Sequence, residues 1–303
     1  MVNKRRLSSS IELLEDCDYP HQTTDARKEV QMDVPVRLQG SNPIVFSVDD
    51  DKTGDAYFVL GIRKCGSTLL NQICRSLAKV NSVLFVDVAG TFFRNDIKAG
   101  RWLTDPAVVA VLRPGNAYGG FRDMPVCFGR EALFVSSPKV LLFRDPRDAL
   151  VSEYFSNAYS HMLPQGGEAQ ASARDHLLAE RQKALESTTD DYVIARVDQM
   201  RRTFLEYRFI LSDSRLLTLK YEDVVFDKPK MVRAIVEHFG WRCSDFAMGK
   251  IVERVDVRPT SENPKAFVRK VTPGDHQEKL KPATIRFLND KLRDVLDLYG
   301  YQT

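Results

Sequence analysis

A strand followed by a glycine-containing turn and a helix start is the feature that most constrains the fold of this chain. The apolar and β-prone residues 56–60 predict a buried strand, residues 61–66 a tight turn, and Ser67 the start of a helix. The first amides of a helix are unpaired and carry the positive end of its dipole, so they bind anions when a glycine lets the backbone approach. Gly66 provides that approach, and we expect a phosphate-binding loop here.

The position of the lysine in this loop indicates the kind of phosphate. In a Walker loop, G-x-x-x-x-G-K-[ST], the lysine follows the second glycine and the next hydroxyl binds Mg²⁺. Here Ser67 occupies the lysine position, and Lys64 lies inside the loop between Gly61 and Gly66. The pattern argues against a nucleoside triphosphate bound with Mg²⁺, but a P-loop nucleotide kinase stays open as an alternative, as does a purely structural turn.

Strands and helices alternate along the rest of the chain. Helical spacing runs from Ser67 to about Lys79, strands are expected at 83–88 and 139–143, and another apolar run covers 106–112. The later expected elements are a helix over 192–211, a strand at 216–223, a helix over 229–239 and a terminal helix over 280–299. Such alternation produces parallel β-α-β units. We therefore expect an α/β fold of the P-loop type with three layers, in which helices flank a central, mainly parallel sheet.

Composition and cysteine usage limit the class of protein. The 303 residues are 28% charged and 43% hydrophobic, as in soluble globular proteins, and the net charge of +3 argues against a nucleic-acid partner. No apolar run approaches the roughly 20 residues that span a bilayer, and the basic start lacks the apolar segment of a signal peptide. The five scattered cysteines lack Cys-x-x-Cys spacing, so we expect a cytoplasmic protein without disulfides or a zinc site.

Three regions are expected to differ in order. Residues 1–45 contain few apolar positions and predict a partly ordered N-terminal extension, and residues 46–303 predict the α/β domain. Within that domain, residues 156–191 are small, polar and glycine-bearing. They predict a mobile excursion, either a lid or wall of the binding site or only a surface loop.

A second anion-binding turn is expected after the strand at 139–143. Arg144 ends that strand, Asp145 can cap the following helix, and Pro146 stands at its first position. Arg144 and Ser152, two turns into the helix, could both reach one phosphate, which a guanidinium group binds bidentately.

These two stretches resemble the nucleotide-binding motifs of the cytosolic-type sulfotransferases, which use 3′-phosphoadenosine 5′-phosphosulfate (PAPS). The segment Lys64–Thr68 is similar to the family's 5′-phosphosulfate loop, usually Pro-Lys-Ser-Gly-Thr-Thr, and departs from it at Arg63 and Cys65. The family's 3′-phosphate motif has an arginine that closes a strand and a serine eight positions later, and Arg144 and Ser152 keep that interval.

A third segment near the C-terminus resembles the family motif Phe-x-Arg-Lys-Gly-x-x-Gly-Asp-Trp. The residues that match it in identity and spacing are Phe267, Arg269, Lys270, Gly274 and Asp275. Val271 replaces a glycine whose amide ordinarily contacts the 3′-phosphate, and His276 replaces the tryptophan. The family also has a Tyr-Glu-Asp turn after a late strand with its tyrosine near the adenine, and Tyr221 corresponds to it, although a structural role for this tyrosine stays open.

The resemblance covers about residue 57 to the C-terminus and implies a PAPS-dependent sulfotransferase. It implies that Lys64 meets the bridging oxygen of the donor and that no metal is required. The donor-binding residues that it implies are Arg63, Lys64, Cys65, Gly66, Ser67, Thr68, Arg144, Ser152, Tyr221, Phe267, Arg269 and Lys270.

The catalytic base does not follow directly from the resemblance. Many relatives have a histidine about two dozen residues before the 3′-phosphate arginine, and this chain has none there. Asp123 precedes Pro125 by the same interval as the family histidine precedes its proline, so it is the first candidate. Asp87, at the carboxyl end of a strand, and His161 are the alternatives.

The acceptor stays open. A small molecule, a glycan or a lipid with a hydroxyl or an amine fits the mechanism, and neither the acceptor nor the oligomeric state follows from the sequence. A non-catalytic protein that binds adenosine 3′,5′-bisphosphate is a further alternative, because Val271 and the missing histidine depart from the family.

Overall fold

The computed structural model describes residues 31–50, 52–163 and 171–303. The predicted N-terminal extension therefore lies outside the described residues up to position 30, and Cys17 lies there with it. Part of the predicted excursion, residues 164–170, is also outside the described range.

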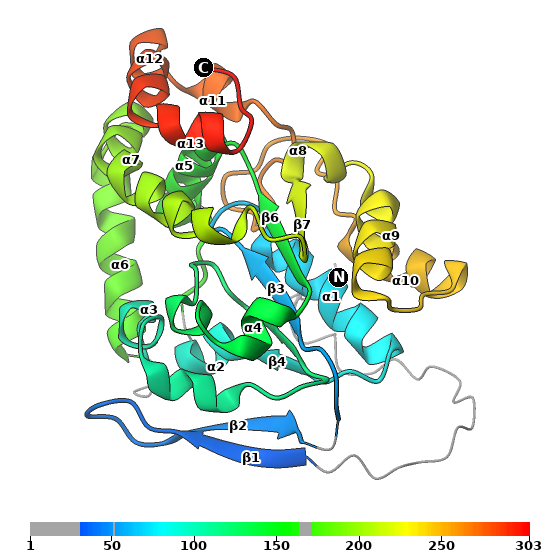
Figure 1. Ribbon diagram of the computed structural model, residues 1–303. Helices are drawn as coiled ribbons and strands as arrows, with labels where there is room; N and C mark the ends of the chain where they lie inside the picture. Colours follow the sequence, from blue (N-terminus) through cyan, green and yellow to red (C-terminus); the bar gives the residue numbers. More distant parts are fainter. Residues whose placement is uncertain (1–30, 51, 164–170) are drawn as a thin grey trace, which may run out of the picture.

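The centre of the fold is a five-stranded sheet in which every neighbouring pair is parallel. Its strands, in the order in which they lie side by side, are β4 (Phe85–Asp87), β5 (Ala117–Gly119), β3 (Tyr57–Gly61), β6 (Lys139–Phe143) and β7 (Leu216–Lys220). Gly61 at the end of β3 is in register with Leu142 of β6. The loop after β3 and the turn after β6 therefore leave the sheet side by side at its carboxyl edge (Figure 1).

Alternation along the strands produces two apolar faces. In β3, Phe58 and Leu60 belong to one buried cluster and Val59 to the other. The Val59 face is covered by α1 (Ser67–Val80), α8 (Tyr221–Val224), α9 (Lys228–Phe239) and α10 (Asp245–Val255). The opposite face is covered mainly by α5 (Pro146–Phe155) and α7 (Thr189–Glu206). The expected three-layer α/β architecture is confirmed.

The remaining helices complete the domain. These are α2 (Val88–Arg94), α3 (Ala99–Trp102), α4 (Ala132–Ser136), α6 (Ala171–Glu186), α11 (Asp275–Lys279), α12 (Pro282–Lys291), α13 (Arg293–Leu298), the 3₁₀-helices η2 (Pro106–Val111), η3 (Val126–Phe128) and η6 (Arg208–Ile210), and the π-helix η4 (Ser156–Ser160). None of the helices in the described ranges is long and apolar enough to cross a bilayer.

Some boundaries differ from those expected from sequence. The apolar run at 106–112 is a 3₁₀-helix, because Pro106 stands at its start and the Asp105 carboxylate caps it by accepting from Ala107 N at 2.9 Å. The strand of this region is β5, which follows the apolar run. The expected terminal helix is two helices, which meet at Leu292.

Residues 31–49 form an antiparallel hairpin of β1 (Gln31–Val36) and β2 (Ile44–Asp49). Its alternate residues are buried, and the Phe46 ring lies 5.2 Å from the ring of Phe92 in α2. Residues 31–45, which the sequence assigns to the extension, therefore pack against the core as ordered structure. The excursion is also partly helical, because it contains η4 and α6.

Candidate active site

The loop after β3 has the geometry of an anion-binding turn. Gly66 has φ +88° and precedes α1, whose first turn no side chain caps. A Cβ at Gly66 would lie 3.0 Å from the Tyr221 ring and 3.1 Å from Leu142, so glycine is required here. Lys64 also adopts the left-handed region, with φ +62°. The first amides of α1 are thus left available for a ligand.

The other predicted loop residues pack around this turn. Ser67 is buried and Thr68 is half-buried at the start of α1. Cys65 is fully buried, and its amide donates to Ile62 O at 3.1 Å. Burial raises the pKa of the Cys65 thiol well above its usual range, which keeps it neutral. Cys65 therefore contributes packing and backbone geometry to the loop.

Lys64 and Arg144 belong to one electrostatic environment. Burial lowers the pKa of Lys64 to about 8, with the charge of Glu153 opposing this decrease and the positive charges of Arg122 and Arg144 contributing to it. The two predicted anion-binding turns, which are 80 residues apart in the chain, thus act on each other across the carboxyl edge of the sheet.

Arg144 is buried, and its Nε donor has no partner among the described residues. Its guanidinium group lies over the Tyr221 ring at 4.8 Å, and its Nη2 donates to Asp148 Oδ2 at 3.3 Å. Because buried polar groups are rarely left unpaired, the Nε donor fits a site for an anion. The Tyr221 ring thus lies beside Gly66, in the space that a Cβ there would enter, and also beneath the Arg144 guanidinium group, so it joins the two turns.

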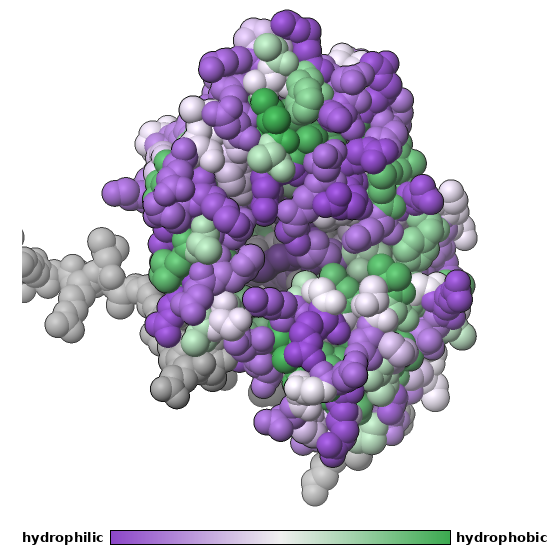
Figure 2. Space-filling view, turned by 90° about the vertical axis from the view of Figure 1, so that its left-hand side faces the viewer, coloured by the Kyte–Doolittle hydropathy of each residue, from purple (hydrophilic) through white to green (hydrophobic). Residues whose placement is uncertain are grey.

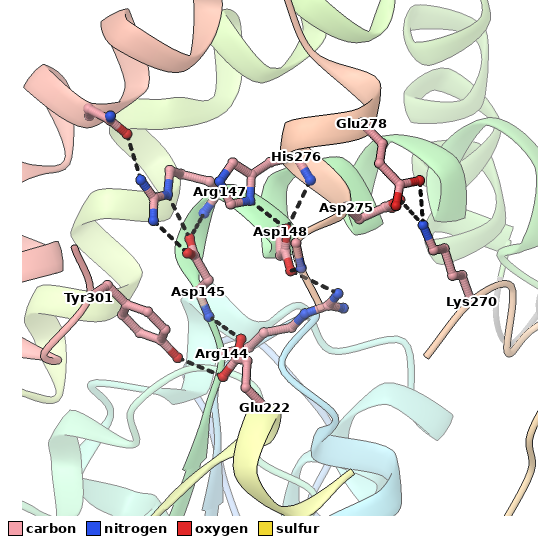
Figure 3. A network of polar contacts seen from close by, with 12 residues as sticks. Arg144, Asp145, Arg147, Asp148, Glu222, Lys270, Asp275, His276, Glu278 and Tyr301 are labelled. Carbon is pink, nitrogen blue, oxygen red and sulfur yellow. Dashed lines mark hydrogen bonds and ion pairs between the residues drawn. The ribbon is translucent and has the colours of Figure 1, made fainter. Parts of the chain in front are cut away.

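Glu222, the neighbour of Tyr221, holds α8 at the end of β6. Its carboxylate accepts from Asp145 N at 3.0 Å and from the Tyr301 hydroxyl at 2.9 Å (Figure 3). Asp145 also caps α5, as expected, and its carboxylate pairs with Arg147 at 2.7 Å. The Arg144 turn is therefore fixed from both sides by polar contacts.

Asp148 is a central residue of this network that sequence reasoning missed. Its carboxylate accepts from Gly274 N at 2.8 Å, His276 N at 2.9 Å and His276 Nδ1 at 2.7 Å, as well as from Arg144 (Figure 3). Burial alone would raise the pKa of Asp148, but the bonds from His276 and the charge of Arg144 hold it well below its usual range. Asp148 thus ties the third motif to α5.

The cations of the third motif are paired with acids of the same segment. Arg269 contacts Glu262 and Asp275, and its guanidinium lies 4.1 Å above the ring of Phe155 in α5. Lys270 Nζ lies 3.2 Å from the Asp275 carboxylate and 2.7 Å from Glu278. These residues adjoin α5, but their charges are already neutralised.

The remaining residues predicted to bind the nucleotide differ in burial and in their contacts. Ser152 is half-buried on α5, one turn before Phe155, and its hydroxyl has no partner in the described part of the chain. Val271 packs against the apolar cluster that contains Tyr221. Phe267 is 69% exposed, so the structure does not bring it to the other residues.

The three candidate bases have different surroundings. Both carboxylate oxygens of Asp123 are bound by Arg63, at 2.7 Å and 2.9 Å from Nη2. Asp87 caps α2 by accepting from Gly90 N at 3.0 Å, and a Cβ at Gly120 would lie 2.1 Å from its Oδ1, so it is enclosed by structure. His161, which follows η4, is half-buried with Nδ1 3.5 Å from Asn157 Oδ1.

His161 lies within the field of the phosphate loop. Burial, together with the charges of Lys64, Arg122 and Arg181, lowers its pKa to about 4. The imidazole is therefore neutral at physiological pH and can accept a proton. Sequence reasoning did not identify Arg122 or Arg181, because no motif or spacing distinguishes an arginine that contributes only its charge.

The surface beside the loop is hollowed and hydrophilic. A cavity of about 280 Å³ is lined by Arg63, Ala99, Gly100, Leu103, Asp123, Gln199, Arg202, Thr203 and Glu206. Figure 2 shows a hollow with hydrophilic walls on the face that carries α6. Within the described residues no group of three or more His, Cys, Asp or Glu side chains is arranged to hold a metal ion.

Solved structures with this fold include sulfotransferases. The mouse sulfotransferase SULT7A1, complexed with PAP, matches with a TM-score of 0.53 and 15% identity over 83% of this chain and 90% of that chain. A retinol dehydratase in complex with androsterone and inactive cofactor PAP has 14% identity and a TM-score of 0.44, covering 88% and 90% of the two chains. A sulfotransferase from Alicyclobacillus acidocaldarius has 13% identity and a TM-score of 0.40, covering 83% and 98%. The first supports the fold, and the other two are too distant to add to it.

Sequence comparison identifies the family. No curated protein matches the sequence. A family model described as the sulfotransferase domain, however, matches residues 54–300, which is most of the chain and includes all three motifs. The chain therefore belongs to the sulfotransferase domain family.

Proposed function

We propose that this sulfotransferase moves the sulfuryl group of PAPS to a hydroxyl or amine of a small-molecule, glycan or lipid acceptor. The observation that carries the proposal is that the Tyr221 ring lies beside Gly66 and beneath the Arg144 guanidinium group, whose Nε lacks a partner among the described residues. A nucleotide with phosphates at both ends suits two anion sites joined in this way. PAPS supplies the sulfuryl group, and the chain supplies the binding and the proton transfer.

The residues present fit such a donor. The amides at the start of α1, with Ser67 and Thr68, would hold the 5′-phosphate, and Lys64 would offset the charge that develops on it. Arg144 and Ser152, which have donor groups without a partner in the described ranges, lie at the end of β6 and on α5 and would hold the 3′-phosphate.

The proton of the acceptor needs a base. In the reaction the bond from sulfur to the 5′-phosphate oxygen breaks, a bond from sulfur to the acceptor atom forms, and the acceptor loses its proton. His161 is neutral and lies in the field of Lys64, and a bound anion would raise its pKa from about 4 toward the ordinary value. We assign the role of proton acceptor to His161. Asp123 is the alternative and ranks second, because Arg63 already binds both of its carboxylate oxygens.

Nucleotide binding tests whether the site takes a donor of the PAPS type. Calorimetry in the presence of a chelator should show that adenosine 3′,5′-bisphosphate (PAP) binds without metal and more tightly than adenosine 5′-phosphate, which lacks the group assigned to Arg144. ATP with Mg²⁺ should bind weakly. Tight ATP binding that requires Mg²⁺, with no binding of PAP, would favour the nucleotide kinase and overturn the proposal.

Transfer of labelled sulfate to a metabolite extract tests the chemistry. His161→Asn should lower kcat by about 10²–10⁴-fold, the range for loss of a general base, and leave PAP affinity unchanged. Asp123→Asn is the matched comparison, and a larger loss there would transfer the role of base to Asp123. Tight PAP binding without transfer to any acceptor would identify a non-catalytic binding protein.

A further inference from the structure

Two arginines near the candidate base are not among the residues to which we assign donor binding. Arg122 lies next to the phosphate loop, because its carbonyl accepts from Arg63 N at 2.9 Å. Arg181 of α6 donates from Nη2 to the His161 carbonyl at 2.5 Å. The charges of both arginines act on the His161 ring. Three segments that are distant in sequence thus place two cations around one imidazole.

The acidic residues of this region do not neutralise these two cations. Asp123 is bound by Arg63, and Arg196 lies 3.2 Å from both Glu153 and Glu180. In contrast, neither Arg122 nor Arg181 forms an ion pair with any described carboxylate. The surroundings of His161 therefore keep an excess of positive charge.

Arg181 also has an unused donor. Its Nε is buried and has no hydrogen-bond partner within the ranges that the structure describes. A buried donor without a partner costs free energy unless a ligand or water satisfies it. The hollow on the face that carries α6 has hydrophilic walls, which suits a polar ligand or water that would satisfy this donor (Figure 2).

We propose that the acceptor is an anion, and that its carboxylate, sulfate or phosphate group is bound by Arg122 and Arg181 while its reacting hydroxyl or amine faces His161. The inference rests on the proposed function, because it names the acceptor class of that same site. Guanidinium groups pair with such anions through two parallel hydrogen bonds. An apolar acceptor would leave both arginines desolvated and unpaired, which is costly.

Three phenols of similar shape that differ in charge test this inference. They are 4-hydroxyphenylacetate, an anion; 4-ethylphenol, which is neutral; and tyramine, a cation. Binding of each to the complex of the protein with PAP is measured by calorimetry, and transfer of labelled sulfate from PAPS to each is measured as kcat/KM. The anion should exceed the other two by about tenfold or more in both measurements.

Arginine variants assign the preference to residues. Arg122→Ala and Arg181→Ala should each reduce the preference for the anion about tenfold through KM. Matched controls are Arg130→Ala, an exposed arginine in the same loop region, and Lys183→Ala, a 71% exposed cation of α6. Both controls should keep the preference, and all variants should keep PAP affinity and melting temperature.

The outcomes separate the inference from the function. Transfer that is equal for the three phenols, or greatest for tyramine, would overturn the anion site and leave the sulfotransferase function standing. Failure of all three to bind or react also overturns the inference, and PAP binding in the same titrations reports on the function independently. Binding of the anion that depends on Arg122 and Arg181, without transfer, would support the site and contradict catalysis.

Discussion

The phosphate loop and the C-terminal motif carry their cations in opposite ways. Lys64 is held in a left-handed turn and forms no ion pair with any described carboxylate. Arg269 and Lys270, in contrast, are bound to acids of their own segment, and Asp148 fixes that segment to α5. One region keeps its charge available through backbone geometry, and the other neutralises its charge internally.

This difference indicates how the two ends of a nucleotide would be bound. The loop needs no rearrangement to accept an anion, because no side chain caps the first turn of α1 and Lys64 has no ion-pair partner among the described residues. A phosphate that approaches the C-terminal motif must compete with Glu262 and Asp275 for Arg269. We therefore expect the loop to contribute more to nucleotide affinity than the C-terminal motif does. We expect Asp148 to contribute mainly to the free energy of unfolding.

The largest effect should follow from Asp148→Asn. Removing this buried charge leaves Arg144 and His276 without their partner, which costs about 3–5 kcal/mol in the free energy of unfolding. Chemical denaturation measures the loss. Lys270→Ala is the comparison and should cost less than about 1 kcal/mol, because its pair with Glu278 is partly exposed and Asp275, its other partner, keeps its contact with Arg269.

The pH dependence of the same variant is a second check. The pKa of Asp148 is lowered in the folded protein from its ordinary value of 3.8, so its contribution is complete above that value and is lost as the pH falls below it. Wild-type stability should decrease in this range by more than that of Asp148→Asn. Equal decreases would show that Asp148 does not link the two segments.

Lys64→Ala should have the largest effect on activity. Loss of a single charge that stabilises the leaving group lowers kcat by about 10²–10³-fold, and the free energy of unfolding should change little. Sulfate transfer and denaturation are the two measurements. Lys79→Ala, an exposed lysine at the other end of α1, should leave both unchanged. An active Lys64→Ala protein would contradict the role of the loop.

Gly66→Ala should have an intermediate effect. A side chain at φ +88° costs about 1–2 kcal/mol, and its Cβ also meets Tyr221 at 3.0 Å, so PAP affinity should fall as well. Gly274→Ala is the matched control in the other region, because it has φ +84° with no atom within 4 Å of the new Cβ. Both variants should lose stability, but only Gly66→Ala should also weaken PAP binding.

The smallest effect is the pH dependence of PAP affinity. With a pKa of about 8 in the free protein, Lys64 is largely protonated at pH 7 and loses its proton as the pH rises, so affinity should fall about fourfold by pH 8.5. Titration calorimetry at several pH values measures this decrease. Lys64→Arg keeps its charge throughout and should show none; the same decrease in both proteins would assign it to another group.

Local signals predicted the elements that carry strong patterns. The strand, turn and helix start of the phosphate loop, the Asp145 cap with Pro146, and the helix ending at Gly240 all agree with the structure. Each depends on residues close together in the chain, so propensity and spacing suffice. The short strand β5 was missed, because three residues are too few to show a period.

The polar contacts of the site could not be predicted in the same way. Asp148 was not distinguished from other helical acids, because its partners lie 126 and 128 residues away. The pairing of Arg269 with Glu262 and Asp275 was also missed, since the motif shows which cations are present but not which acids neutralise them. Charge environments of this kind arise only from tertiary structure.

The φ of +62° at Lys64 also bears on how this protein can evolve. A residue with a branched or long side chain is disfavoured there by about 1 kcal/mol, and glycine or asparagine relieves that strain. Selection for a more robust fold alone would therefore favour the replacement of Lys64, to which we assign charge compensation in the reaction. If Lys64 has the assigned role, stability and turnover place opposite demands on the residue at this position, because the lysine adopts a conformation unfavourable to it.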